Sequence, residues 1–296
     1  MEDILDTEAP VVFDNSITRY EMRTYRPYAT STYRNNDAIH IAIQHQDQCL
    51  LPARSFIRIQ GKLRQRPDAN PGANLKLINN GVLFLFSEIR YELNAQVIDR
   101  CTNVDISSTM KGYPTFTPSQ EKNLENAGWF LDETNIITDA AGNFEFMIPL
   151  SMIFGIAEFY KKIIVNMRHD LIFIRSNVDG NATMRTGAEA IEATISIDTI
   201  EWIVPTVILF EREKVNLLKF IEKDPFIKVW FLKRELFYHP LLPTSTRHVW
   251  TVKTATQMEK PRYVIVGFQT NRDNVATRNA SHFDHVNLTN IRLYLN

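Results

Sequence analysis

The stretch Ser55-Phe-Ile-Arg-Ile-Gln-Gly-Lys-Leu-Arg-Gln-Arg66 alternates apolar and polar side chains over most of its length. Ile57, Ile59 and Leu63 fall at alternate positions, with charged or amide residues between them. Because successive side chains of a β-strand point to opposite faces, this pattern predicts a strand with one buried and one wet face. The wet face is predicted to be a solvated or interface-facing sheet edge, and its basic residues are Arg58, Lys62, Arg64 and Arg66.

Short segments of the same kind recur along the chain, rich in Ile, Val, Phe, Tyr and Thr and separated by turn residues. Such spacing is typical of antiparallel sheet rather than of helices. The other expected strands are 38–44, 89–99 with a tight turn at Asn94-Ala95, 143–148, 163–174, 193–204, 226–238, 247–253, 262–270 and 288–295. So many strands are too many for one sheet, and we predict two β-sandwiches in tandem.

Helical periodicity is confined to a few places. In residues 211–224 apolar side chains recur at helical spacing before Pro225, which predicts a helix that packs one stripe onto a sheet. A second helix is expected over residues 118–126, with Thr117 as its N-cap and Glu121 near the capping-box position.

Three further segments complete the predicted organisation. A helical stretch over residues 151–160 lies at the chain midpoint, where we expect the junction between two domains. Residues 68–74 and 176–188 are polar and are predicted to be exposed loops. Residues before Asp37 lack a clean periodicity and are expected to form an arm.

The composition is that of an ordinary globular protein, with 296 residues, 44% hydrophobic and 23% charged. A net charge of -1 gives no overall positive field that could hold nucleic acid or an anionic membrane. No apolar run approaches the roughly 18 residues of a membrane helix, and the acidic N-terminus does not resemble a secretory signal. We therefore expect a soluble protein in a reducing compartment, with Cys49 and Cys101 as buried thiols.

Motifs for catalysis and cofactor binding are missing from the sequence. It contains no GxSxG, no GxxxxGK[ST], no GxGxxG after a strand and no HExxH. His282-Phe-Asp-His285 is the best candidate for a metal-binding pair, but in a strand its two histidines would point to opposite faces. We therefore predict no catalytic, cofactor-binding or metal-ligating residue, no cofactor and no enzyme activity.

The N-terminal stretch interleaves arginines with tyrosines. Arg pairs with phosphates and Tyr stacks on bases, so contact with single-stranded nucleic acid is one interpretation. Both residue types are also favoured at protein–protein interfaces, and we favour an interface because the rest of the chain supplies no basic field. The candidate subunit-interface residues are Arg19, Tyr20, Arg23, Tyr25, Arg26, Tyr28 and Tyr33, with the loop aromatics Tyr113 and Phe116.

Several stretches form a familiar set. They are Asn79-Asn-Gly-Val-Leu-Phe-Leu-Phe-Ser-Glu-Ile-Arg-Tyr-Glu-Leu-Asn94, Val97-Ile-Asp-Arg100, Ser108-Thr-Met-Lys-Gly-Tyr113, Phe146-Met-Ile-Pro-Leu150, Pro240-Leu-Leu-Pro243, Trp250-Thr-Val-Lys-Thr-Ala-Thr256 and Pro261-Arg-Tyr-Val-Ile-Val-Gly-Phe-Gln-Thr-Asn271. Together, over about residues 37–296, they resemble the double jelly-roll major capsid proteins of the Polinton/Maverick, adintovirus-like lineage.

The resemblance implies a mainly β fold of two tandem eight-stranded jelly-roll β-sandwiches with a few short helices. It implies an N-terminal arm over residues 1–36, a first jelly roll over 37–160 and a second over 161–296. It also implies homotrimers that form pseudo-hexameric capsomers and build an icosahedral shell around a DNA genome. The implied partners are further copies of the chain, penton and minor capsid proteins and, weakly, the genome through the arm, with no membrane. The protein would be made in the host cytoplasm and reside in the virion.

In relatives the chain continues beyond the Leu293-Tyr-Leu-Asn296 strand with a segment that helps to close the second jelly roll. We therefore expect an incomplete second jelly roll, either because the chain is a fragment or because a partner supplies the missing part. Two other functions stay open at this point. One is a soluble ligand- or carbohydrate-binding β-sandwich module. The other is a cupin-like enzyme, which would need a His-x-His strand with a Glu shortly after it, and this sequence has none.

Overall fold

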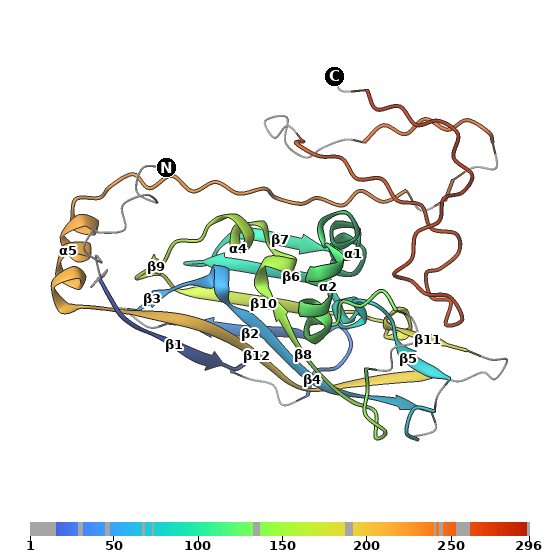
Figure 1. Cartoon of the computed structure of the whole chain (residues 1–296), viewed down its shortest axis with the longest axis horizontal. Helices are drawn as coiled ribbons and strands as arrows, with labels where there is room; N and C mark the ends of the chain where they lie inside the picture. Colours follow the sequence, from blue (N-terminus) through green and yellow to red (C-terminus); the bar gives the residue numbers. More distant parts are fainter. Residues whose placement is uncertain are drawn as a thin grey trace, which may run out of the picture.

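Two β-sheets pack face to face in the computed structural model of the chain (Figure 1). The structure describes residues 16–28, 32–44, 48–66, 69–72, 74–132, 137–186, 192–239, 241–242, 245–252 and 261–294. One sheet has six strands in the order β8-β4-β12-β3-β9, with β1 also paired to β12. These strands are β1 (Ile17–Tyr25), β3 (Cys49–Leu50), β4 (Phe56–Gln65), β8 (Asn143–Pro149), β9 (Ile164–Val165) and β12 (Ala193–Leu209).

The second sheet has four strands in the order β2-β10-β6-β7. They are β2 (Ala38–Ile43), β6 (Phe86–Leu93), β7 (Gln96–Thr102) and β10 (His169–Arg175). The turn predicted at Asn94-Ala95 joins β6 to β7, and both residues have a positive φ. A two-stranded ribbon of β5 (Leu75–Leu77) and β11 (Thr183–Arg185) lies at one end of the sandwich (Figure 1).

The core between the sheets contains the predicted apolar face of β4. Ile57, Ile59 and Leu63 are all at most 1% exposed. Gly61 lies in the same row. A glycine is needed there because a Cβ would come within 2.3 Å of the Ser196 carbonyl oxygen. The predicted strand is thus confirmed, but β4 lies between β8 and β12 rather than at a sheet edge. The prediction of a basic sheet edge is wrong.

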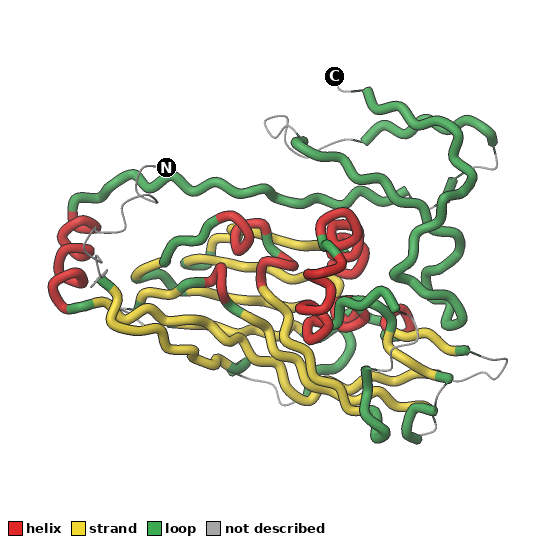
Figure 2. Tube along the Cα trace, in the orientation of Figure 1, coloured by secondary structure: helices red, strands yellow, loops and turns green. Residues whose placement is uncertain are grey.

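Short helices lie over the sandwich (Figure 2). They are α1 (Val104–Thr115), α2 (Pro118–Leu124), α3 (Leu150–Ile153) and α4 (Gly155–Phe159), together with 3-10 turns at Pro52–Arg54, Gly81–Leu85, Glu125–Ala127 and Gly180–Ala182. The Thr117 cap of α2 is confirmed, with Gln120 rather than Glu121 completing the capping box because Gln120 is the third helical residue. Among the described residues, no helix is long and apolar enough to span a membrane.

The predicted helix near residue 211 is confirmed as α5 (Glu211–Glu222), but none of its residues is buried. Leu217 packs against a small cluster made by Cys49, Leu51 and Val207. The prediction that a full apolar stripe of this helix packs onto a sheet is therefore wrong.

Strand pairing corrects two predicted boundaries. β9, β10 and β12 follow residue 160, yet they pair with β2, β3, β4 and β6 of the same sandwich. The first sandwich therefore runs on to Leu209, and α3 and α4 lie within it rather than at a domain junction. Part of the predicted N-terminal arm is also strand, because β1 extends the sheet beside β12; residues 1–15 lie outside the described residues.

After α5, the described residues form no strand or helix. The chain runs back along the sandwich as an extended segment and then folds into loops near β5 and β11 (Figure 1). Strands predicted at 226–238, 247–253, 262–270 and 288–295 are therefore wrong over their described parts. A strand needs a neighbour for its N–H and C=O groups, and these segments form no ladder of paired strands among the described residues.

Candidate interface surfaces

The outer edge of β1 is the first candidate surface. β1 pairs antiparallel with β12 from Ile17↔Leu209 to Tyr25↔Trp202, so its side chains alternate between the two faces of the sheet. Tyr20 and Met22 are 54% and 55% exposed. Arg19 and Arg23 both form ion pairs with Glu21 on the same strand. Tyr20 and Met22 therefore lie on one face of β1, and the partly neutralised charges of Arg19, Glu21 and Arg23 lie on the other.

The N-terminal candidates do not all face solvent. Tyr28 is 78% exposed, whereas Tyr25 and Tyr33 are partly buried and pack against the core of their own chain. The Tyr25 hydroxyl donates to Gln48 Oε1 at 3.1 Å. Burial raises the pKa of both tyrosines, so both hydroxyls stay protonated at neutral pH.

Arg26 forms an ion pair with a buried carboxylate, although its own side chain is 73% exposed. Its Nε donates to Oε1 of Glu201 at 2.7 Å, and Glu201 is 2% exposed. Oε2 of Glu201 accepts from Arg58 Nη1 at 3.3 Å, and Arg58 Nε donates to Glu145 at 2.7 Å. The row of charges therefore crosses β12, β4 and β8 on the outer face of the six-stranded sheet. This row could not be predicted from the sequence, because only the strand register brings these residues together.

An apolar row runs beside that charged row. Register pairs Thr24 with Ile203, Ile203 with Phe56, and Phe56 with Pro149, and directly paired residues lie on the same face. Ile203, Phe56 and Pro149 are half-buried. The outer face of this sheet thus combines apolar and charged rows, a mixture that is common at protein–protein interfaces.

Tyr113 and Phe116 occupy a different part of the molecule. Both pack edge-on against Trp129, with ring centroids 5.4 and 5.1 Å apart. Tyr113 also contacts the ring of Phe283, and α1 lies well away from β1 in Figure 1. The predicted interface residues therefore divide between two surfaces, and Phe116 contributes mainly to the core of its own chain.

Most of the exposed large apolar residues in the described chain lie after α5. The sequence did not predict this surface, because these residues have the composition of strands in a second sandwich. Phe226 is 87% exposed, Trp230 68% and Tyr263 71%. Other exposed large apolar residues of this region are Ile227, Val229, Phe237, Tyr238, Leu241, Leu242, Val249, Trp250, Val252, Val264, Ile265, Val266, Val286, Leu288, Ile291, Leu293 and Tyr294. Apolar surface on this scale marks an interaction site.

Part of that segment is anchored to the sandwich. Arg234 Nη1 donates to the Met152 carbonyl oxygen at 2.9 Å, and the Trp230 ring lies 6.0 Å from that of Phe159. Gly155 leaves room for the Leu232 backbone, since a Cβ would clash with its carbonyl oxygen. Burial lowers the pKa of Arg234, although an arginine keeps its charge in proteins.

His282 and His285, the candidate metal-binding pair, hydrogen-bond to other residues of their own loop. His282 bonds to Asn279, and the His285 ring accepts from the Asn287 backbone N–H. Across the ranges that the structure describes, no group of three or more His, Cys, Asp or Glu side chains could hold a metal ion. Cys49 and Cys101 are buried, and burial raises the pKa of both thiols.

Comparison with known proteins gives one family match. A family model described as "Double jelly roll-like domain" matches residues 75–296. No curated protein matches the sequence.

Three solved structures to which the chain is similar come from the Sputnik virophage, Faustovirus and mavirus. The Sputnik virophage structure has a TM-score of 0.48 and 10% identity, covering 70% of this chain and 51% of that one. The Faustovirus major capsid protein has a TM-score of 0.46 and 11% identity, covering 75% and 60%. The mavirus major capsid protein has a TM-score of 0.39 and 10% identity, covering 63% and 46%. The chain thus spans 46% to 60% of the length of these structures.

Proposed function

Because the chain belongs to the double jelly roll-like domain family, we propose that it is a structural capsid protein of a virus or a virus-derived element. The family match over residues 75–296 is the observation that carries this proposal. The motifs between Asn79 and Asn271 that resemble Polinton/Maverick major capsid proteins support that lineage in particular.

Self-association is the activity proposed for this protein. Obligate interfaces bury on the order of 2,000 to 5,000 Å² and are rich in apolar and aromatic residues. The apolar residues exposed between Phe226 and Tyr294 are of that kind. In the proposed assembly, three chains form a pseudo-hexameric capsomer, and capsomers pack into an icosahedral shell around a DNA genome.

The other proposed contacts follow from this role. Penton and minor capsid proteins would join the shell, and the basic N-terminal region would make at most a weak contact with the genome, given the net charge of -1. The protein would be made in the host cytoplasm, act in the virion and have a structural rather than a catalytic role. Of the candidate contact residues, Arg19, Tyr20, Arg23, Tyr28 and Tyr113 stay in the proposal. Tyr25, Tyr33 and Phe116 pack against the core of their own chain, and Arg26 pairs with Glu201.

The test is the mass of the protein in solution by light scattering coupled to size exclusion, with negative-stain imaging of the same peak. A mass near three times 34.3 kDa with triangular or pseudo-hexagonal particles is expected. A stable monomer at every concentration would contradict self-association by this chain. A monomer that gives specific hits on a glycan array would favour the ligand-binding module instead.

A further inference from the structure

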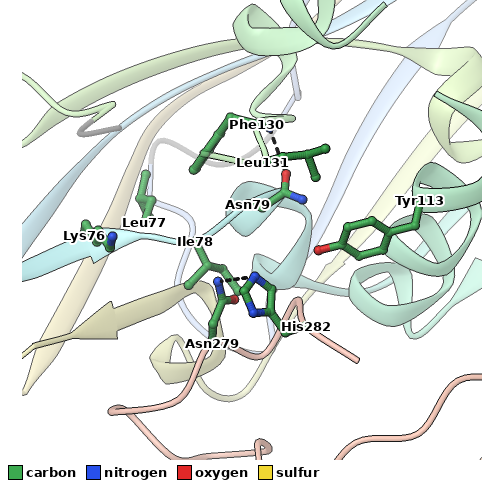
Figure 3. A pocket seen from close by; sticks show the side chains of 9 residues that line it. All are labelled: Lys76, Leu77, Ile78, Asn79, Tyr113, Phe130, Leu131, Asn279 and His282. Carbon is green, nitrogen blue, oxygen red and sulfur yellow. Dashed lines mark hydrogen bonds between the residues drawn. The ribbon is translucent and has the colours of Figure 1, made fainter. Parts of the chain in front are cut away.

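A small cavity lies at the seam between the sandwich and the loop of residues 279–282 (Figure 3). Its volume is about 10 Å³. The residues that line it are Lys76, Leu77, Ile78, Asn79, Tyr113, Phe130, Leu131, Asn279 and His282. A cavity of this size is just large enough for one water molecule and too small for an organic ligand.

Asn79 gives this cavity its chemistry. The side chain is 4% exposed, and its Oδ1 accepts a hydrogen bond from the Phe130 backbone N–H at 2.9 Å. Its Nδ2 is buried and has no hydrogen-bond partner among the described residues. A buried donor left unpaired is strongly destabilising, so such groups in folded proteins are nearly always satisfied, often by an internal water.

The neighbouring residue explains why Asn79 is held in this place. Asn80 has a φ of 60°, and its Nδ2 donates to Ser108 Oγ at 2.7 Å and Thr109 Oγ1 at 3.0 Å. The turn is therefore fixed to α1 on one side and to Phe130 on the other. The Asn79 amide cannot swing out to solvent without breaking these contacts.

Other polar groups converge on the same space. Figure 3 shows the Tyr113 hydroxyl directed towards the cavity, and the side chains of Asn279 and His282 rise into it from the loop. The Tyr113 ring is held between Trp129 and Phe283. A molecule here would therefore meet a donor from Asn79 and a hydroxyl from α1.

We propose that this cavity binds one structural water molecule, which accepts a hydrogen bond from Asn79 Nδ2 and donates one to the Tyr113 hydroxyl oxygen. The water fastens the loop of residues 279–282 to the sandwich. The loop is also held by Gln269 Nε2, which donates to the Ala280 carbonyl oxygen at 2.7 Å. The adjoining residues are tied to β11 by the Arg185 backbone N–H, which donates to the Ala276 carbonyl oxygen at 2.8 Å. Ala280 and Ser281 are 5% and 0% exposed, so the loop is part of the packed structure.

The direct test is a high-resolution crystal structure of the whole chain. One ordered water within hydrogen-bond distance of both Asn79 Nδ2 and the Tyr113 hydroxyl is expected. A dry cavity, or a direct bond between Asn79 Nδ2 and a protein acceptor, would overturn the proposal.

A solution test uses Tyr113→Phe, which removes the hydroxyl and keeps the ring, and Asn79→Leu, which removes the buried amide. Both should expose the neighbouring loop, so trypsin should cleave after Arg272 and Arg278 about fivefold faster, consistent with the loss of one hydrogen bond. Tyr160→Phe, at a half-buried ring that does not line the cavity, is the matched control and should leave the rate unchanged. If Asn79→Leu does not fold, Tyr113→Phe still decides, since an unchanged cleavage rate for it contradicts the proposed bridge.

Discussion

A substitution at a surface arginine changes the stability of the fold as well as an interface when that arginine pairs with Glu201. Its carboxylate is buried, and the guanidinium groups of Arg26 and Arg58 compensate its charge. A buried charge that loses its partner is strongly destabilising, whereas an exposed ion pair contributes little. Arg26, which the sequence indicated as an interface residue, therefore has a role within its own chain. Sequence alone could not reveal it, because 175 residues separate the two partners.

Arg26→Glu is accordingly expected to lower the free energy of unfolding by roughly 1 to 2 kcal/mol, because it places a second carboxylate beside the buried Glu201, while the 73% exposure of Arg26 and the remaining pair with Arg58 limit the loss. Arg23→Glu should cost less than about 1 kcal/mol, since Arg23 pairs with Glu21 at a half-exposed site. Urea denaturation of the two variants measures the difference. Combining Arg26→Glu with Glu201→Gln should recover much of the loss, and equal stability of both single variants would contradict this account.

His169 is a second residue whose environment the sequence did not disclose. It is 1% exposed, its Nδ1 lies 2.8 Å from the Tyr91 hydroxyl, and its ring packs near Trp202. Burial lowers the pKa of His169 from 6.5 to about 4, against the opposing effect of Asp170. The neutral ring is therefore the form that the folded core accommodates.

The consequence is acid sensitivity. Because the folded-state pKa lies below the unfolded one, the contribution of His169 is complete above pH 6.5 and is lost as the pH falls from 6.5 to about 4. The loss is roughly 3 kcal/mol, at about 1.4 kcal/mol for each pH unit between the two pKa values. Urea unfolding between pH 7 and pH 4 should show a shallower decline for His169→Gln than for the natural protein. His285→Gln, at an exposed ring, is the control, and parallel curves for all three proteins would contradict this role.

The natural protein must be compared with His169→Gln because other groups also titrate between pH 7 and pH 4. Burial raises the pKa of Asp105 to about 6, with Asp273 adding to the effect. A carboxyl whose folded-state pKa is raised favours the folded state as the pH falls, which is opposite in sign to His169. The difference between the natural protein and His169→Gln cancels that contribution.

At the scale of elements, strands whose apolar residues alternate clearly were predictable. β4, β2 and the β6–β7 hairpin have one buried face each, and their sequence periodicity reflects it. β1 was not predictable, because its residues are exposed or half-buried on both faces. It is a strand because β12 offers it a neighbour, which is a property of the sheet rather than of residues 17–25.

Since β1 presents Tyr20 and Met22 at the sheet edge, replacing both with Ser should weaken self-association about tenfold or more without loss of fold. Size exclusion with light scattering over a range of concentrations measures the shift towards monomer, and circular dichroism checks the fold. Val97→Ser removes an exposed apolar side chain from β7 of the other sheet and is the matched control. Unchanged association of the double variant would exclude this edge as a contact surface.

At the scale of the whole molecule, the prediction of a mainly β, double jelly-roll fold with a few short helices is confirmed by the family match, whereas the strands of the described residues pair within one sandwich. The first sandwich is complete at β12, because every strand of its two sheets has a paired neighbour by that point of the chain. The segments after α5 have strand-like composition, yet strand formation depends on a neighbour that composition does not specify. The domain boundary was misplaced for the same reason, since β9 to β12 are strands of the first sandwich that a linear reading assigned to the second.

Hydrogen exchange should therefore distinguish the two parts of the isolated chain. Amides of β4, β6, β10 and β12 should exchange slowly, because they are paired within the sandwich. Peptides from residues 261–270 and 288–294 should exchange quickly in the isolated chain, and should become protected in assembled particles if assembly supplies neighbours for them. Mass spectrometry of exchange on both samples measures this, with β4 as the internal reference. Protection of those peptides equal to that of β4 in the unassembled chain would mean that they already pair within it, and the exposed apolar residues would then no longer argue for self-association.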